Sequence, residues 1–510
     1  MTETSAKRPI APKSEREPAK NRGSTMNRLQ SSGTRSPAYD MTFLWSVCLV
    51  AAMGGLLFGY DWVVIGGAKP FYEPYFHIAP KSFWQGLAQS SALAGCLVGA
   101  VLSGMLTDRW GRRRLLTAAG LLFTASAVWT ALAESYVSFN AARILGGIGI
   151  GLASNLSPMY IAEVSPAEVR GVFVSINQLT IVIGILAAQI TNWAIAQPVP
   201  PGIAEDQLAG FIRGTWNGQF GWRWMFGAET VPAALFFLLM FFVPESPRWL
   251  VKAGRDTAAE RILARVGGPR YAENALRDIR ESLASQAGHR TRIGDLFEPG
   301  ILRIVALGVF LAVFQQWCGI NVIFNYAQEV FQAAGYGVSA VMLNIVITGV
   351  INLIFTFVAI YTVDRWGRRT LMLMGAGGLA GIYLVLGLGY HFHSTGIHML
   401  VLVVSAIACY AMSLAPVTWV IISEIVPNRI RGVGVSIAVF SLWLGCTALT
   451  LTFPLLLGAL GPDGVFWLYG AICVAGFLGI LRFLPETKGR TLEAIERQFL
   501  RAETTTRTIT

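Results

Sequence analysis

The sequence predicts an all-α membrane protein in which twelve transmembrane helices form two pseudo-symmetric six-helix bundles, with a cytoplasmic helical insert between them. Composition is the first observation: of 510 residues, 54% are hydrophobic and only 14% are charged, against about 25% charged in an average soluble domain. The second is a series of apolar runs that can each cross a bilayer, which takes about 20 residues. The third is a pair of motifs that recur in both halves of the chain.

The apolar runs fall into two sets of six, separated by a charged stretch. They lie at residues 41–67, 83–107, 115–133, 138–162, 172–196 and 222–243, and at residues 301–333, 340–363, 371–391, 398–422, 433–457 and 464–484. The charged stretch contains helix-forming segments, so we expect a small helical insert on the cytoplasmic side. The predicted domains are a tail (1–40), a bundle (41–243), a linker (244–300), a second bundle (301–484) and a second tail (485–510).

The distribution of charge predicts the orientation in the membrane. The net charge is +11, and most Lys and Arg residues lie in loops on one side of the predicted bundle. The positive-inside rule therefore places both termini in the cytoplasm of a cell-membrane protein. Contact with anionic lipid explains these basic faces, so we expect no nucleic-acid partner. The N-terminal tail is rich in Pro, Ser, Lys and Arg, lacks the apolar core of a signal peptide, and is expected to be disordered.

Several function classes lack their sequence signatures. No lysine follows a glycine, so the phosphate-binding P-loop is absent. The six cysteines fall within apolar runs without metal-ligand spacing, and we interpret them as free thiols. We expect a protein that is not an enzyme and has no metal and no cofactor, and we expect it to be monomeric.

Three ionisable residues lie well inside the predicted spans: Asp61, Arg143 and Glu229. A charged group within a span costs at least about 2.5–3.5 kcal/mol and therefore has a partner or a function. Counted from the outer ends of their spans, all three lie roughly 8–11 Å below the outer surface, at about 1.5 Å per residue. Pairing of Asp61 with Arg143 is therefore possible.

The two halves share two motifs at matching places. The sequence DRWGRR follows span two at residues 108–113 and span eight at residues 364–369. The pattern Glu163…Arg170 follows span four, and Glu424…Arg431 follows span ten. A duplicated six-helix unit is typical of transporters whose halves rock about a site near the midplane.

With these motifs the chain resembles the major facilitator superfamily and, within it, the sugar porter family. The resemblance rests on GYD at residues 59–61, DRWGRR in both halves, PESPRWL at 244–250, QQxxGxN at 315–321 and PETKG at 485–489. It covers nearly the whole chain beyond residue 40. It implies a secondary active transporter that imports a monosaccharide together with protons by alternating access.

A pair between Asp61 and Arg143 that opens and closes would bind and release a proton, because the arginine favours the charged carboxylate. The resemblance supports this role, since proton-coupled members of the family carry Asp at this place. The alternative is a permanent ion pair that only holds helices in register. Glu229 matches a family carboxylate in the sixth helix, and a structural role remains equally open for it.

Neutral amides in the spans suit an uncharged ligand, because an amide and a sugar hydroxyl each donate and accept hydrogen bonds. The alternative for any single amide is an interhelical hydrogen bond of about 0.6 kcal/mol. Aromatic side chains add apolar faces for the sugar ring. From the residues and the resemblance together, the predicted sugar-binding set is Phe58, Gln178, Gln315, Gln316, Asn321, Tyr326, Trp419 and Trp443.

The chain departs from the family at Ile185, at Leu442 and at Asn325-Tyr326, where characterised members carry other polar or aromatic side chains. The sugar is therefore not inferred by analogy, and pentoses, hexoses and polyols all stay open.

Arg–carboxylate pairs at the cytoplasmic helix ends are predicted to hold the halves together there, because such pairs are directional yet breakable near water. Control of topology by positive charge is the alternative. The predicted gating set is Asp108, Arg109, Arg112, Glu163, Arg170, Glu245, Arg248, Asp364, Arg365, Arg368, Glu424, Arg431 and Glu486.

Two other functions compete with the proton-coupled importer. The first is an energy-independent facilitator, in which Asp61 has only a structural role. The second is a transporter-like sugar sensor, which usually carries long extra cytoplasmic domains, whereas the tails expected here span residues 1–40 and 485–510.

Overall fold

The computed structural model describes residues 39–79, 81–200, 203, 205–287, 298–427 and 430–488. Within these residues the regular structure is entirely helical. The two predicted tails fall almost wholly outside the described residues, as does the segment 288–297 of the linker.

The first half contains five long helices followed by shorter ones. The elements are α1 (Met41–Tyr75), α2 (Ser82–Trp110), α3 (Arg112–Leu132), α4 (Tyr136–Val164), α5 (Ala167–Ile195), α6 (Glu205–Gly214), a π-helical turn η1 (Asn217–Gly221), α7 (Trp222–Gly227) and α8 (Thr230–Leu239). The charged stretch between the halves forms α9 (Pro247–Lys252) and α10 (Asp256–Ala287).

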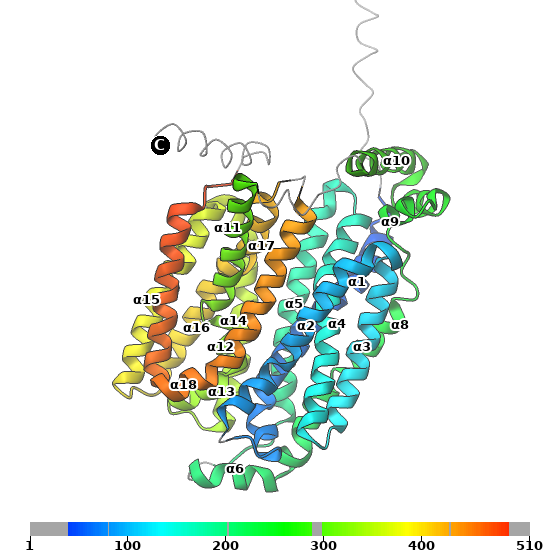
Figure 1. Ribbon diagram of the computed structural model, residues 1–510. Coiled ribbons are helices and arrows are strands. Elements are labelled where there is room, and N and C mark those ends of the chain that lie inside the picture. Colours follow the sequence, from blue (N-terminus) through cyan, green and yellow to red (C-terminus); the bar gives the residue numbers. More distant parts are fainter. Residues whose placement is uncertain are drawn as a thin grey trace, which may run out of the picture.

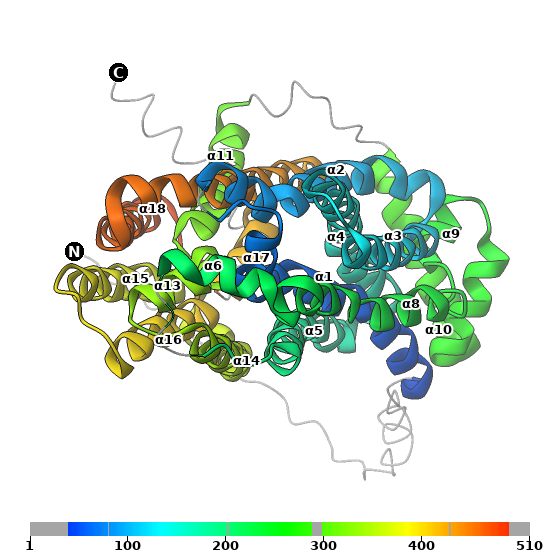
Figure 2. The same cartoon turned by 90° about the horizontal axis from the view of Figure 1, so that it is seen from below.

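The second half contains α11 (Pro299–Trp317), α12 (Ile320–Asn325), α13 (Ala327–Ala333), α14 (Val338–Trp366), α15 (Arg368–His391), α16 (Ile397–Met412), α17 (Leu414–Ile425) and α18 (Arg431–Phe483). Figure 1 shows the two halves as neighbouring bundles, and Figure 2 shows the same separation from below. We call the end that carries α9 and α10 the inner end, and the end that carries α6 the outer end (Figure 1).

Ten helical segments in the described chain are long and apolar enough to cross a membrane. The last of them, in α18, contains the two predicted runs 433–457 and 464–484, which are separated by a non-helical Gly461. The predicted run 222–243 is divided between α7 and α8, so neither piece alone reaches spanning length. The predicted all-helical membrane fold is confirmed.

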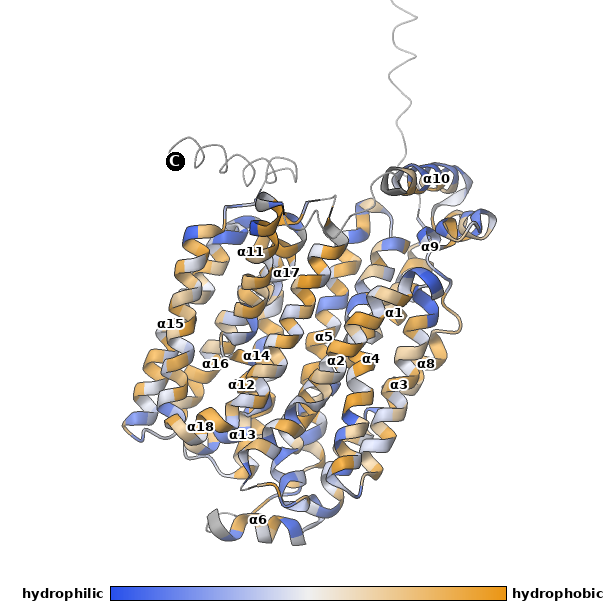
Figure 3. Ribbon diagram, in the orientation of Figure 1, coloured by the Kyte–Doolittle hydropathy of each residue, from blue (hydrophilic) through white to orange (hydrophobic). Residues whose placement is uncertain are grey.

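Large apolar side chains cover the outside of the bundle. Phe242 is 85% exposed, Val231 75% and Leu132 70%. Hydrophobic residues extend along the helices, and hydrophilic ones concentrate toward their ends (Figure 3). Such a surface is unfavourable in water and favourable against lipid, because exposing apolar area to water costs about 25 cal/mol per Å².

Glycines allow the helices of the first half to approach closely. A Cβ on Gly147 of α4 would collide with the backbone oxygen of Ala92 in α2, and one on Gly151 would collide with that of Cys96. The interfaces between α2 and α4 therefore depend on small residues, which is common where lipid supplies no hydrophobic driving force for helix association.

The prediction that the first span ends at Gly67 is wrong, because α1 continues to Tyr75. Lys69 and Glu73 interrupt the apolar run, and Pro70 and Pro74 normally indicate the end of a helix. The added two turns remain helical because they are buried against neighbouring helices, with Phe71 and Tyr72 fully buried.

The seventh span is not one helix. Gly319, with φ +88°, separates α11 from α12, and Tyr326 separates α12 from α13. A left-handed φ favours glycine, because a Cβ would clash with the backbone. The QQxxGxN motif thus lies at the break between α11 and α12.

The insert is joined to the first half. The backbone of Asp40 donates to the carbonyl of Val266 at 2.8 Å, and the guanidinium of Arg265 lies over the ring of Phe43 at 4.2 Å. Within α10, Gly267 and Gly268 form a kink.

Candidate functional site

A buried ion pair connects α1 and α4. One Arg143 guanidinium nitrogen contacts Asp61 Oδ1, and the other donates to the backbone oxygen of Asp61 at 2.9 Å. Both side chains are 1% exposed. The pairing predicted from their equal depth is confirmed, although its function as a proton switch stays a prediction.

Glu229 lies at the start of α8 and is 2% exposed. It interacts electrostatically with both Asp61 and Arg143. Its Oε1 atom has no hydrogen-bond partner in the described chain. Phe226, in the preceding turn, packs on the Arg143 guanidinium at 5.2 Å. The three predicted intramembrane charges therefore form one cluster.

The second carboxylate oxygen of Asp61 faces α4 at a glycine. A Cβ on Gly146 would lie 2.9 Å from Asp61 Oδ2, and no described residue donates a hydrogen bond to that oxygen. A carboxylate oxygen without a donor is a position at which a proton can bind once Arg143 no longer favours the charged carboxylate.

A chain of hydrogen-bonded amides extends along α11 and α12. Gln315 donates to the hydroxyl of Tyr410 at 2.6 Å, Gln316 donates to Gln315 at 2.5 Å, and Asn321 donates to Gln316. All three predicted amides are buried. Asn321 Oδ1 remains without a partner among the described residues. The adjacent glutamines therefore form one polar network.

Aromatic rings connect the halves near this network. Phe58 lies 5.7 Å from Trp443 and 6.3 Å from Trp62, and Trp62 lies 6.2 Å from Phe324, measured between ring centroids. The indole nitrogens of Trp62 and Trp443 are buried and have no acceptor in the described part of the chain. Predicted residues Phe58 and Trp443 are thus brought together, with two indole donors beside them.

Two amides that were not predicted from the sequence lie on facing helices of the two halves. Gln189 of α5 is 1% exposed and lies 3.4 Å from the hydroxyl of Thr348 in α14. Its Oε1 and the Nδ2 of Asn344 have no described partner. Gln189 follows the apolar Ile185 by one helical turn on the same face, which is the signal that could have indicated it.

Three predicted sugar-binding residues show no hydrogen bond to these polar groups in the described chain. Gln178 is half-buried, and Trp419 is 38% exposed. Tyr326 is buried, and its hydroxyl donates to the backbone of Thr450 at 2.6 Å. Their contact with a sugar stays a prediction.

The inner end of the first half contains a network of charged groups. Arg112 pairs with Glu163 at 2.9 Å and with Asp108 at 3.7 Å. Glu245 accepts from the backbone nitrogens of Arg112 and Arg113 at 2.9 and 3.0 Å. A carboxylate at the start of α3 is favourable because it meets the positive end of the helix dipole.

The second half repeats this arrangement. Arg368 pairs with Glu424 at 3.4 Å, and Glu486 accepts from the backbone nitrogens of Arg368 and Arg369 at 3.0 and 3.1 Å. The hydroxyl of Ser246 donates to Glu163 in the first network, and the hydroxyl of Thr487 donates to Glu424 in the second.

The other predicted gating residues lie at the same end. Arg109 is exposed, Arg170 donates to the backbone of Ser165 at 3.5 Å, Arg248 donates to Ser282 at 3.3 Å, and Arg365 lies over the ring of Tyr361 at 3.9 Å. The side chains of Asp364 and Arg431 are outside the described part of the structure.

The halves meet near the outer end. Lys69 of α1 pairs with Glu329 of α13, and the backbone nitrogen of Val199 donates to the hydroxyl of Ser339 at 2.9 Å. A Cβ on Gly66 would lie 2.6 Å from the backbone oxygen of Phe324. The ion pairs described at the inner end, by contrast, join residues of the same half.

Known proteins are similar to this chain in both sequence and fold. The family described as "Sugar (and other) transporter" matches residues 47–499. The arabinose-proton symporter of Bacillus subtilis is 37% identical over 94% of this chain and 99% of its own. The D-xylose-proton symporter of Escherichia coli strain K12 is 40% identical over 90% of this chain and 96% of its own.

A solved structure of the E. coli xylose transporter, in a partially occluded inward-open conformation, superposes with a TM-score of 0.76 at 38% identity. It covers 88% of this chain and 100% of that one. The fold and the buried cluster of Asp61, Arg143 and Glu229 define a secondary transporter of the major facilitator class. The chain belongs to the sugar transporter family of that class.

Proposed function

We propose that this protein imports a monosaccharide across the membrane together with protons, by alternating exposure of a site between its halves. The observation that carries the proposal is the buried Asp61–Arg143 pair. It lies in the same half as Phe58 and Trp62, two of the aromatic residues described above. The relatives named as symporters of arabinose and xylose support it over nearly their full lengths.

The coupling step is protonation of Asp61. While Arg143 contacts Asp61, the pair favours the charged carboxylate, and separation of the two would leave a desolvated carboxylate that takes up a proton. Glu229 is the nearest alternative acceptor, since it interacts with both members of the pair.

The sugar site is proposed to lie among the buried polar groups without described partners. These are the indole donors of Trp62 and Trp443, the acceptors Asn321 Oδ1 and Gln189 Oε1, and the donor Asn344 Nδ2. An unmade buried hydrogen bond costs about 1–3 kcal/mol, and a ligand rich in hydroxyls satisfies donors and acceptors together. Because these side chains are all neutral, the site favours an uncharged ligand.

The charged networks at the inner end are proposed to close the inner face in the opposite conformation. Each half holds its own Arg–carboxylate pair at this end. A rearrangement that brings the inner ends together would allow these groups to pair across the halves.

We further propose a monomer in a bacterial inner membrane, with both termini cytoplasmic. The basic loops at the inner end support this orientation.

A facilitator is the second candidate, because a buried Asp–Arg pair can also be purely structural. Uptake into proteoliposomes, with arabinose, xylose, galactose, glucose and myo-inositol and with or without an imposed pH gradient, separates the two. One pH unit supplies about 1.36 kcal/mol per proton, so a symporter accumulates its sugar about tenfold. Equilibration without accumulation would favour the facilitator.

A further inference from the structure

A second buried charge cluster lies two turns outward from Asp61 on the same helix. Lys69 is 1% exposed, pairs with Glu73 of its own helix at 3.4 Å and contacts Glu329 of α13 in the other half. The ring of Tyr326 lies 4.9 Å from its ammonium nitrogen. An uncompensated buried ammonium is costly, so Lys69 needs a counter-charge in every state of the protein.

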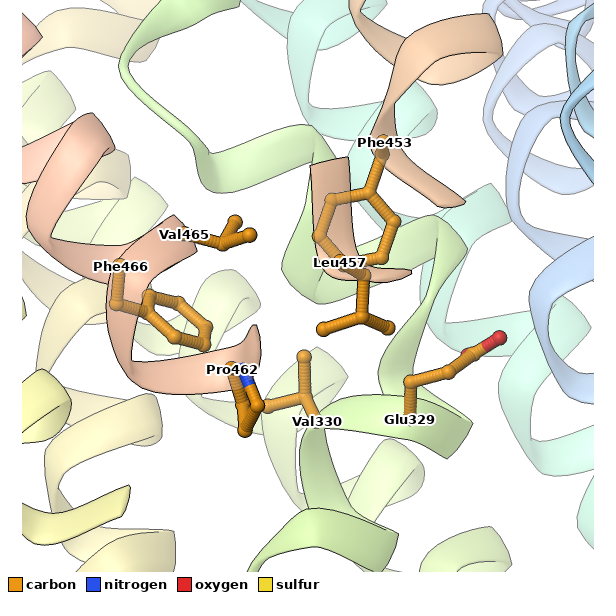
Figure 4. Close-up of a pocket in the computed structure, with 7 residues that line it drawn as sticks. All are labelled: Glu329, Val330, Phe453, Leu457, Pro462, Val465 and Phe466. Carbon is orange, nitrogen blue, oxygen red and sulfur yellow. The ribbon is translucent and has the colours of Figure 1, made fainter. Parts of the chain in front are cut away.

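The two carboxylates belong to different bodies. Glu73 is 4% exposed and accepts a hydrogen bond from Gln85 of α2 at 3.2 Å, so it is fixed within the first half. The side chain of Glu329 is 22% exposed and belongs to the second half. Figure 4 shows Glu329 at the edge of a small apolar hollow formed by α13 and α18, with its carboxylate directed away from the apolar side chains.

The backbone around the cluster allows the halves to separate. Helix α13 is divided from the rest of the seventh span at Tyr326 and Gly319. On the other side, Pro70 and Pro74 remove two backbone hydrogen-bond donors from the outer end of α1. Glu329 therefore lies on a segment that two breaks separate from the helix below it, whereas Lys69 and Glu73 belong to the continuous helix α1.

We propose that Lys69 is the outer gate residue of this transporter and that it exchanges partners between the two conformations. Lys69 pairs with Glu329 when the outer face is closed. When α13 moves away, Glu73 keeps the ammonium compensated within the first half. The inference rests on the proposed alternating access, and it assigns a role to three residues that lie outside the proton and sugar sites.

The exchange predicts opposite effects for the two carboxylates. Removing the charge of Glu329 weakens only the closed state, because Lys69 keeps Glu73 in both conformations. Removing the charge of Glu73 penalises the open state more than the closed state, because Lys69 still has Glu329 in the closed state but loses its last counter-charge as α13 departs. A pair that merely stabilises the fold would make both variants shift in the same direction.

The test measures the separation of the outer ends directly. Nitroxide labels on Val137→Cys and Ile397→Cys, positions 76% and 72% exposed at the outer starts of α4 and α16, report the distance between the halves in a background without the six native cysteines. Double electron–electron resonance on purified protein in nanodiscs is the readout. Glu329→Gln is expected to raise the ratio of outer-open to outer-closed protein about tenfold or more, and Glu73→Gln to lower it by a similar factor.

Equal shifts in both variants, or no shift in either, would overturn the exchange. The triple variant K69M/E73Q/E329Q removes every charge of the cluster, so it keeps the test available if a single variant does not fold. Its ratio of outer-open to outer-closed protein should equal that of K69M/E329Q, because position 73 acts only through Lys69. The distances are measured without sugar or a pH gradient. Failure of the gate is therefore distinguishable from failure of the proposed symport, which the uptake assay reports on the unaltered chain.

Discussion

Asp61 is compensated by one guanidinium, and its second oxygen faces Gly146 without a donor among the described residues. Replacing it with Asn keeps the shape and the contact with Arg143 while removing the titrating group. We expect Asp61→Asn to abolish accumulation of sugar against a gradient while counterflow between equal sugar pools persists.

The matched control for this substitution is Asp463→Asn. Asp463 pairs with His391 at 3.0 Å at the outer end, far along the chain from the charge cluster. The Asp463→Asn variant should accumulate sugar normally. Concentrative uptake by Asp61→Asn, measured with an imposed pH gradient, would show that the proton is bound elsewhere.

Gln316 both donates to Gln315 and accepts from Asn321, so it is the centre of the amide chain. Loss of a buried hydrogen-bond partner costs about 1–3 kcal/mol. Gln316→Ala should therefore raise the apparent KM for sugar roughly five- to 150-fold at normal expression. Gln219→Ala, which removes an amide bonded to the Arg213 backbone in the outer loop, is the control. An unchanged KM in Gln316→Ala would place the sugar away from α11.

At the scale of helices, the contact of α2 with α4 depends on the absence of a side chain at Gly147, where a Cβ would collide with the backbone of Ala92. Overpacking of this kind typically costs about 1–3 kcal/mol. We expect Gly147→Ala to lower the melting temperature of the purified protein measurably. Gly104→Ala should not, because a Cβ there meets nothing within 4 Å. If Gly147→Ala and Gly104→Ala have equal melting temperatures, the helices α2 and α4 can move apart at little cost.

At the scale of the whole molecule, the contact of the halves near the outer end is expected to open and close during transport. The Val199 backbone and the Ser339 side chain meet there at 2.9 Å across the two halves. Cysteines at both positions should form a disulfide under oxidation and stop uptake, because the outer face can no longer open. Reduction should restore transport.

Single-cysteine variants exposed to the same oxidant are the control, since five of the six native cysteines are buried. If oxidised protein, shown to be crosslinked by its gel mobility, still takes up sugar at the normal rate, the outer ends do not separate during transport.

The sequence alone determined the membrane class, the duplicated architecture and the presence of Asp61 and Arg143 inside the spans. Hydrophobic run length and repeated motifs are local properties, and a charged residue within an apolar run is visible without the fold. These features needed no knowledge of which helices are neighbours.

Only the tertiary structure decided which helices lie against each other and which polar groups remain without partners. Lys69 and Glu73 lie where the apolar run ends, and nothing local indicates that α1 continues through Pro70 or that Glu329 approaches from the other half. Gln189 and Asn344 became candidates only when α5 and α14 were found to face each other. The physical reason is that a buried charge or amide is defined by what packs around it, and for Lys69 and Gln189 part of that surrounding comes from the other half of the chain.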